Sequence, residues 1–501
     1  MEELVRNEFW ILPKPKYIEI NPKENGITLS SLWTIYVNKY RIKDNALLLS
    51  SKFNKHFNTF LNTIPIRDST LDEKLEDKYY LAVVTSESQY KTQIKRNMNE
   101  LLEKHISRYE EIQNKCCFDL DPNKTNSSLP LDESYYLNIS KGVIFIISTS
   151  PRGFYYGIQS LVQIVEHSLF QIENQDEFII LPSMILLDFP ELEYRGISID
   201  LKTFRPTIES LNEFIPFLAK YKFNHIVLVD KTGFPYSEEE KKFRDLCNFH
   251  RINFSFVTNL EQLEKKNIKI IHYHEDGSYF LPDYLMTLKN IAQFCDSLSD
   301  TSEGFLISTP NGRNYPLDLM IPYLPIISDM FWNPKAPTTL KRWIKAMGST
   351  HLNLFEDSLQ KSMFDFRKMT YFSSRDGKNR SMDTLLKELN DMKKRAYENS
   401  HLLDILEWGF QTRELTHMIL KLKENLESNN PNGKRIEDIP EKLEKFSETY
   451  SALNTQVIKI LETTNRVQRG ECHRYFQTHN SNLKTLVESW IPEYLKKISS
   501  N

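Results

Sequence analysis

The stretch EYRGISIDLKTFRP, from Glu193 to Pro206, decides the fold. Its apolar and β-branched residues predict a strand that starts at Tyr194 and ends at Asp200. The segment TIESLNEFIPFLAKYKF follows with the apolar spacing of an amphipathic helix, and NHIVLVD then predicts a second strand. A strand, a returning helix and a parallel strand form the unit from which parallel sheets and barrels are built.

Three further strand-like runs, INFSFVT, IKIIHYH and GFLIST, lie in the same region of the chain. Five strands that alternate with helical segments predict a parallel sheet or barrel. A complete (β/α)₈ barrel takes about 200–250 residues, and residues 189–334 are too few for one. We therefore expect an α/β fold here, either an incomplete TIM-type barrel or an open parallel sheet of about five strands.

Different patterns flank this region on both sides. Residues 1–188 mix strand-like runs, such as SYYLNIS and GVIFIIST, with helical segments and predict an N-terminal α/β domain. Residues 335–501 contain long, charged, periodic segments, interrupted by the turn-like NNPNGKR, and predict an all-helical C-terminal domain. We thus expect three domains, at residues 1–188, 189–334 and 335–501.

The composition is that of an ordinary globular protein and argues against several classes of function. Hydrophobic residues make up 40% of the 501 residues and the formal net charge is −3, so we expect no nucleic-acid partner. Only 14 residues are glycine, and neither a dinucleotide-binding fingerprint nor a P-loop motif occurs. We therefore expect no cofactor.

No segment has the pattern of a targeting or membrane sequence. The first residues, MEELVRNEFWILPKPK, lack the apolar core of a signal peptide, and no run reaches the about 18 apolar residues that span a bilayer. The five cysteines are odd in number and unpatterned, which suits a reducing compartment. We expect a cytoplasmic protein without a membrane partner.

Three stretches share their order and spacing with one protein family. The first is ESYYLNISKGVIFIISTSPRGFYYGIQSLVQIV, with a Tyr-Gly-x-Gln-Ser-Leu-x-Gln pattern from Tyr156 to Gln163. The second is DFPELEYRGISIDL, and the third runs from EGFLIST to YPLDLMIPYLPIISDMFWNP. They resemble the end of the N-terminal domain, the first barrel strand, and the last strand and helix of the β-N-acetylhexosaminidases of glycoside hydrolase family 20.

The resemblance implies a TIM barrel behind a small α/β domain, and the removal of a terminal β-linked N-acetylhexosamine. In that family an Asp-Glu pair at the end of the fourth strand carries the reaction, and the substrate's own acetamide attacks the anomeric carbon. The resemblance also implies that Arg195 binds ring hydroxyls of the terminal sugar. A glycan that contains N-acetylhexosamine is therefore the expected carbohydrate partner.

The catalytic stretch of that family has no counterpart in this sequence. The Asp-Glu pair normally lies in a His-x-Gly-Gly-Asp-Glu-like segment, which is absent here. IKIIHYH already resembles the seventh strand of the barrel, so strands four to six are missing from the pattern. The segment Thr309-Pro310-Asn311-Gly312 also lacks the Trp and the acid that are usual after the last strand.

Arg195, Asp200 and Asp230 are the candidate substrate-binding residues. The two acids end neighbouring strands, on the side where barrel enzymes form their sites, although bonding to the following loops alone is the simpler interpretation. Arg195 has a second interpretation as well. It could be a buried structural arginine that forms a salt bridge with Asp200 or Asp230.

Glu275 and Asp276, in IIHYHEDGSYF, are the only candidates for a catalytic role. A retaining glycosidase needs two carboxylates about 5 Å apart, and a metal ion needs a pair of histidines with a carboxylate. However, the acids stand in the reverse order to the family's pair and on a different strand. A polar strand end with one core histidine is the simpler interpretation, and we expect no metal site.

These observations predict a divergent family 20-like pseudoenzyme that lacks hexosaminidase activity and acts in glycan or protein binding. A protein partner would bind through the helical C-terminal domain. The alternative is an active β-N-acetylhexosaminidase-like glycosidase that removes terminal N-acetylhexosamine with acids placed elsewhere.

Overall fold

The structure of the protein is a computed structural model, and it describes most of the chain up to residue 334 and several helices beyond it. The described residues are 11–21, 26–30, 33–57, 61–65, 78–120, 130–140, 142–170, 178–201, 206–229, 237–265, 268–272, 293, 295, 304–308, 317–321, 324–334, 382–395, single positions between 401 and 419, 439–463 and 485–499.

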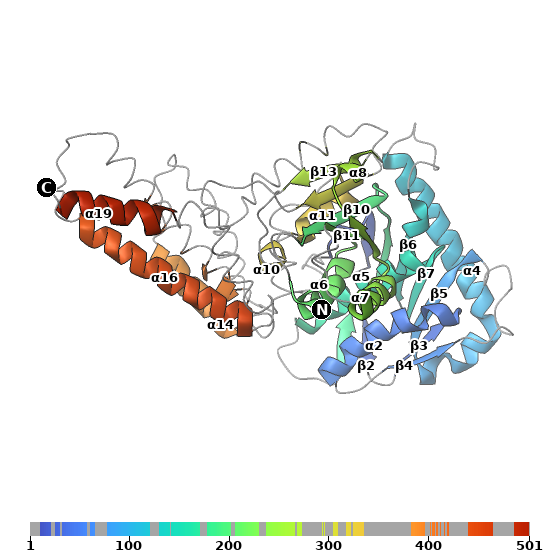
Figure 1. Cartoon of the computed structure of the whole chain (residues 1–501). Helices are drawn as coiled ribbons and strands as arrows, with labels where there is room; N and C mark the ends of the chain where they lie inside the picture. Colours follow the sequence, from blue (N-terminus) through green and yellow to red (C-terminus); the bar gives the residue numbers. More distant parts are fainter. Residues whose placement is uncertain are drawn as a thin grey trace.

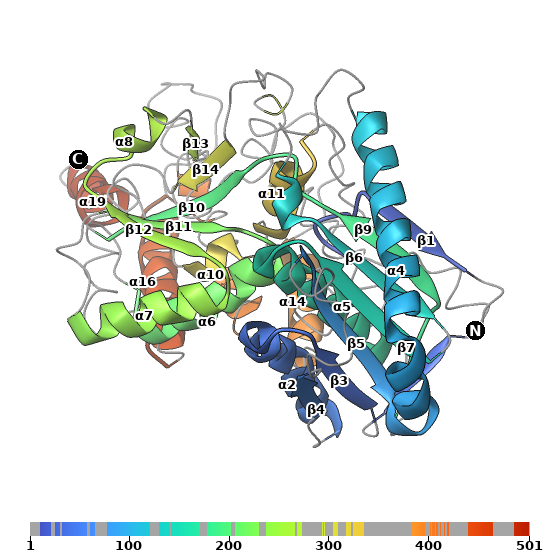
Figure 2. The same cartoon turned by 90° about the vertical axis from the view of Figure 1, so that its right-hand side faces the viewer.

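A seven-stranded sheet forms the centre of the N-terminal part (Figures 1 and 2). Only β3 and β4 pair in parallel, and the other neighbours are antiparallel. In spatial order the strands are β1 (Tyr17–Ile20), β9 (Met184–Asp188), β6 (Tyr135–Ser140), β7 (Val143–Ser148), β5 (Tyr80–Ser86), β3 (Trp33–Val37) and β4 (Asn62–Pro65). A separate antiparallel pair joins β2 (Ile27–Ser30) and β8 (Phe178–Leu181).

Helices cover both faces of this sheet, because alternate residues of its strands are apolar on each side. The long α4 (Glu87–Leu120) packs Leu102, Ile106 and Tyr109 against one face. The other face packs against α2 (Lys43–Phe57) and α5 (Pro151–Phe170). Two short 3₁₀ turns, η1 (Tyr40–Ile42) and η4 (Leu131–Glu133), precede α2 and β6.

The second sheet has five parallel strands, whose positions agree with the five strand-like runs of the sequence. Their order is β12 (Asn253–Val257), β11 (His225–Val229), β10 (Tyr194–Asp200), β14 (Gly304–Ser308) and β13 (Ile268–His272). In the described part of the chain β12 and β13 are the two edges, so the sheet is open there. The last strand in sequence, β14, lies between β10 and β13.

The helices of this second part are α6 (Ile208–Lys220), α7 (Ser237–Phe249), α8 (Glu261–Glu264), α10 (Leu317–Met320) and α11 (Leu324–Trp332). Helix α6 begins because the Thr207 side chain accepts a hydrogen bond from Ser210 N at 3.1 Å. Its buried face, which includes Leu211, Ile215 and Leu218, belongs to the same core as the apolar face of α5. One continuous core therefore joins the two sheets.

The described elements beyond residue 334 are all helices. They are α14 (Met382–Arg395), α16 (Ile439–Thr463), η8 (Leu486–Trp490) and α19 (Ile491–Ser499), and Figure 1 shows them to one side of the two sheets. The buried residues of α16 recur at intervals of seven, three and four, as on one face of a packed helix, and are Leu443, Tyr450, Leu453, Val457 and Leu461.

Candidate functional site

The boundary between the two sheets contains a buried cluster of charged residues. Lys222 from the second part pairs with Asp188, the last residue of β9, with Nζ 2.5 Å from Oδ2, and neither side chain is exposed to solvent. Lys222 Nζ also donates to the Tyr135 hydroxyl at 2.8 Å. Burial lowers the pKa of Lys222, against the opposing effect of Asp188, and raises that of Tyr135.

Lys222 reaches this position because of how α6 ends. Phe223 N donates to Leu218 O at 3.1 Å and Lys222 N to Ala219 O at 3.0 Å, which is the bonding pattern of a Schellman motif. Lys222 occupies the left-handed position of the motif, with φ of 62°, where glycine is usual. In this position the lysine directs its side chain to Asp188, which a glycine could not do.

Arg195 forms the second half of the cluster and uses every one of its donors inside the protein. Its Nη2 donates to Glu133 Oε2 and to the Tyr156 hydroxyl, and its Nε donates to Lys222 O at 3.2 Å. Nη1 donates to the backbone oxygens of residues 192 and 193 at 2.5 and 3.3 Å. With five N–H groups and five bonds, the guanidinium keeps no donor for a sugar hydroxyl.

Glu133 is buried and connects Arg195 with a second arginine. Its Oε1 accepts from Arg152 Nη1 at 3.0 Å and from Asn224 Nδ2 at 3.3 Å. Among the described residues, the salt bridge of Arg195 is therefore made with an acid from the N-terminal part of the chain, rather than with Asp200. The strand explains why: Asp200 lies five residues from Arg195, about 17 Å along an extended chain, at the opposite end of β10.

The indole of Trp332 completes the cluster. Its Nε1 donates to Asp188 Oδ1 at 2.7 Å. Lys222 Nζ lies 4.6 Å and Arg195 Cζ 4.8 Å from the ring, distances at which cation–π attraction operates. Trp332 ends α11, so the boundary cluster joins residues from all three stretches that resemble the hydrolase family.

Residues of the Tyr-Gly-x-Gln-Ser-Leu-x-Gln pattern on α5 make contacts at the same boundary between the two sheets. Ser160 Oγ lies 2.6 Å from the Tyr135 hydroxyl, and Gln163 Nε2 donates to Lys220 O at 3.2 Å and to Leu12 O at 2.8 Å. At Gly157 an added Cβ would lie 2.7 Å from Ile146 Cγ2, so α5 could not pack as closely on β7. The pattern therefore serves the packing of α5 against β6, β7 and the end of α6.

The carboxyl ends of the second sheet contain the remaining candidates. Asp200 is half-buried at the end of β10, directly across from Val229 on β11, and it takes part in an interaction within the protein. Ser198, two residues earlier, is buried, and its Oγ has no hydrogen-bond partner in the described part of the structure. Asp230, Glu275 and Asp276 lie outside the described residues.

Two histidines near the boundary are held neutral. Burial lowers the pKa of His225 to about 3, with Arg152 and Arg195 adding to the effect, and burial lowers that of His250 to about 4. His250 Nδ1 lies 2.6 Å from the Tyr155 hydroxyl, and the His225 ring stacks on Tyr194 with 3.8 Å between centroids. Neutral, bonded imidazoles of this kind serve packing.

The residues that the structure describes contain no group of three or more His, Cys, Asp and Glu side chains suited to a metal ion. None of the helices it describes combines the length and the apolar character needed to cross a bilayer.

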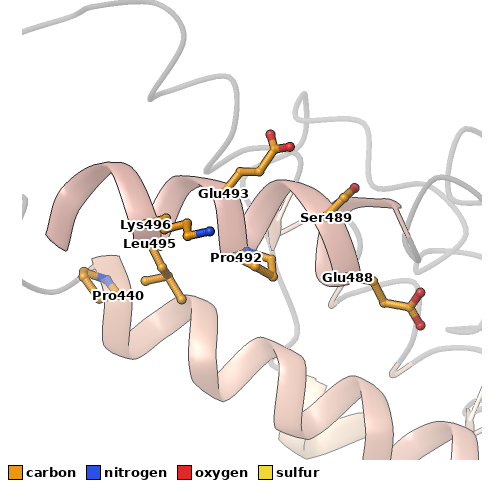
Figure 3. Close-up of a pocket in the computed structure, with 7 residues that line it drawn as sticks. All are labelled: Pro440, Glu488, Ser489, Pro492, Glu493, Leu495 and Lys496. Atoms are coloured by element: carbon orange, nitrogen blue, oxygen red, sulfur yellow. The ribbon is translucent and has the colours of Figure 1, made fainter. Parts of the chain in front are cut away.

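A hollow of about 820 Å³ lies between the start of α16 and the helices η8 and α19 (Figure 3). It is widely open to solvent, and no residue that the sequence singled out lines it. Its lining mixes acidic, basic and apolar side chains: Pro440, Glu488, Ser489, Pro492, Glu493, Leu495 and Lys496.

Comparisons with known proteins find a family match in the N-terminal part of the chain. Residues 10–185 match the model of glycosyl hydrolase family 20, domain 2. A Beta-hexosaminidase from Porphyromonas gingivalis is 29% identical over 103 residues, which are 20% of this chain and 13% of that protein. The chain is thus a glycoside hydrolase family 20-like protein, and its match spans a small part of that relative.

Solved structures give distant matches. The GH20 Exo beta-N-Acetylglucosaminidase from Vibrio harveyi, an inactive mutant, has 13% identity and a TM-score of 0.31, covering 58% of this chain and 44% of that one. The structure of CpGH84D has 10% identity and a TM-score of 0.44, covering 95% and 93%.

Sequence reasoning singled out Arg195 and Tyr156 but missed the other charged members of the boundary cluster. Glu133, Asp188 and Lys222 lie in loops or at element ends, where a charged residue is ordinary. One signal was available for Trp332, since it lies near the end of the third stretch that resembles the hydrolase family.

Proposed function

We propose that this family 20-like protein lacks hexosaminidase activity and acts by binding a glycan or a protein. The observation that carries the proposal is the bonding of Arg195. The resemblance assigned this residue to the sugar, whereas all five of its N–H groups are bonded within the boundary cluster. A hydrolase of this type needs a sugar-orienting donor as well as its acids.

The sequence supports the same proposal from the catalytic side. The His-x-Gly-Gly-Asp-Glu-like segment is absent, and the loss of an acid–base group typically costs a factor of about 10²–10⁴ in rate. We propose that residues 189–334 form an incomplete TIM-type barrel that retains its docking to an N-terminal domain of residues 1–188. The helical residues 335–501 would then be the part that takes a protein partner.

The alternative is an active glycosidase, and the curated relative named Beta-hexosaminidase favours it. In that case the candidate acids would be Glu275 and Asp276, which follow β13 in the sequence, and Asp200 and Asp230 would bind the substrate. The two functions differ in one measurable respect, which is turnover.

The test is the release of 4-nitrophenol from its N-acetyl-β-glucosaminide by the purified full chain, beside an active hexosaminidase as the positive control. We expect no release above the buffer rate, while circular dichroism shows a folded protein. If turnover is seen, the variants Asp200→Asn and Glu275→Gln test which acid it needs, since each removes one charge with little change of size. Turnover that either variant abolishes would establish the glycosidase and reject the proposal.

Binding is tested separately by isothermal titration with N,N′-diacetylchitobiose. Saturable binding without turnover supports a glycan-binding role. If the disaccharide fails to bind, the glycan part of the proposal is rejected for this ligand and the protein-binding part remains to be tested by affinity capture on the isolated full chain.

A further inference from the structure

Three arginines come from segments that hydrogen bonds bring together beside the end of α7. Arg41 lies in η1, Arg152 in the first turn of α5, and Arg251 directly after α7. Hydrogen bonds fix their neighbourhood: Asn45 of α2 donates to Phe249 O at 3.1 Å and accepts from Arg251 Nη2 at 2.8 Å. Figure 2 shows α2 close to α7, as these bonds require.

Arg251 is placed by the same backbone device as Lys222. Ile252 N donates to Cys247 O at 2.9 Å and Arg251 N to Asn248 O at 3.1 Å, so α7 also ends in a Schellman motif. Arg251 occupies its left-handed position, with φ of 60°. The two helix ends differ in what the cation meets. Lys222 meets Asp188, whereas Arg251 has no carboxylate partner among the residues that the structure describes.

The surroundings of Arg251 are cationic and partly closed to solvent. Its Nε is buried and makes no hydrogen bond to any described residue. Burial lowers the pKa of Arg251, and the charges of Arg152 and Arg41 lower it further. A half-buried guanidinium with an unused donor and two cationic neighbours is unfavourable unless an anion balances it.

The groups bonded to the two neighbouring arginines do not balance the charge of Arg251 either. Arg152 shares the single carboxylate of Glu133 with Arg195, and its other nitrogen donates to Asn253 Oδ1 at 3.0 Å. Arg41 is exposed and has no ion pair with any described residue, and its guanidinium lies 4.7 Å from the Tyr80 ring. Among the described residues, these arginines and Arg195 therefore outnumber the acids beside them, which are Glu133 and Asp132.

We propose that Arg41, Arg152 and Arg251 form a binding site for the phosphate or sulfate group of a soluble ligand. A tetrahedral oxyanion offers several acceptors, and arginine forks match such groups with paired, charge-assisted hydrogen bonds. Tyr40, next to Arg41, exposes 76% of its surface and provides a ring on which the remainder of the ligand can stack. The site is distinct from the carboxyl ends of the sheet and does not depend on the proposed glycan or protein binding.

The experiment is isothermal titration of the full chain, at constant ionic strength, with inorganic phosphate, inorganic sulfate, N-acetylglucosamine 6-phosphate and N-acetylglucosamine 6-sulfate. Neutral N-acetylglucosamine is the matched ligand without the charge. We expect saturable binding of at least one oxyanion ligand and none of the neutral sugar. The order of the four affinities distinguishes phosphate from sulfate, and a free ion from a sugar ester.

Three variants locate the binding. We expect Arg41→Gln and Arg251→Gln each to weaken it by about tenfold, which corresponds to about 1.4 kcal/mol. Arg108→Gln on α4 removes the same charge outside the cluster, since Arg108 pairs with Glu111, and should leave the affinity unchanged. Arg41 is exposed, so its variant remains informative even if Arg251→Gln does not fold.

Two results would overturn the proposal. One is the absence of saturable binding of all four oxyanion ligands to the folded wild-type protein. The other is an equal loss of affinity in Arg108→Gln and Arg41→Gln, because binding would then reflect the overall charge and not this site.

Discussion

Lys222 and Asp188 form a 2.5 Å ion pair in which both side chains are completely buried, and they come from opposite sides of the boundary between the two sheets. Each also bonds to other members of the cluster, so neither charge is left unpaired in the folded state. The pair thus makes correct docking of the two sheets a condition for burying both charges.

Removal of one partner should therefore destabilise the protein strongly. We expect Asp188→Asn or Lys222→Met to lower the free energy of unfolding by about 3–5 kcal/mol, because the remaining charge stays buried without compensation. Urea unfolding followed by circular dichroism measures this. The exposed Arg108–Glu111 pair is the control, and Arg108→Ala should cost no more than about 1 kcal/mol. Equal changes in the free energy of unfolding at the two pairs would contradict the expected cost of leaving a buried charge unpaired.

Trp332→Phe tests the indole contribution to the same cluster. The change keeps an aromatic ring but removes the hydrogen bond from the indole to Asp188 Oδ1. That oxygen still accepts a hydrogen bond from Phe189 N at 3.0 Å. We expect a loss of about 1–3 kcal/mol. The same substitution in the Asp188→Asn background should cost less, since the charged acceptor is already gone. Additive losses in this double-mutant cycle would contradict the coupling.

Acid should weaken the protein through Glu166. Burial alone would raise its pKa, but Lys220 and Lys52, at 2.7 and 2.8 Å, outweigh burial and lower the pKa from 4.5 to about 2. An acid with a depressed folded-state pKa contributes stability above pH 4.5 that is lost as the pH falls toward 2. Glu166→Gln should therefore lower the free energy of unfolding by up to about 3 kcal/mol at pH 7. Below pH 4.5 the free energies of unfolding of the variant and the wild type should approach each other.

The measurement is the free energy of unfolding in urea between pH 2 and pH 7 for the wild type, Glu166→Gln and the exposed control Glu111→Gln. A difference between the wild type and Glu166→Gln that stays constant across this range would show that Glu166 does not titrate as expected.

Two glycines of the second sheet should respond differently to alanine. At Gly304, with φ of 155°, a Cβ would lie 2.0 Å from the backbone oxygen of Tyr194. At Gly196 it would lie 2.7 Å from the ends of the Leu306 and Tyr194 side chains. Side-chain ends can move, so we expect about 1–3 kcal/mol for Gly196→Ala. Gly304→Ala should be the more damaging, because backbone must shift. Thermal unfolding of both variants checks the order.

The sequence predicted the local elements of the second sheet well, and its long-range contacts poorly. Tyr194–Asp200 is both the predicted strand and the observed β10, because alternation and β-branched residues are local signals. The partner of Arg195 was not predictable in this way. Glu133 lies 62 residues away beside the other sheet, and nothing in a local pattern states which distant acid will meet a buried arginine.

The candidate site was predictable only in part, for the same reason. The sequence placed Asp200 at a carboxyl strand end, where the structure has it. The Tyr156–Gln163 pattern was recognised as a likeness to a family, but its role in packing α5 against α6 and β6 required the bonds of Ser160 and Gln163. The cationic cluster around Arg251 joins residues from three elements and had no signal in the sequence.

The position of β14 in the second sheet has a consequence for biosynthesis. As the chain leaves the ribosome, β10 can pair with β11 at once, but its other neighbour is synthesised only after β11, β12 and β13. Until then the central strand presents an unpaired edge, and β13 has no strand to join. The second sheet of a nascent chain should therefore need protection by holding chaperones for longer than the N-terminal sheet. The N-terminal sheet is complete once β9 has emerged.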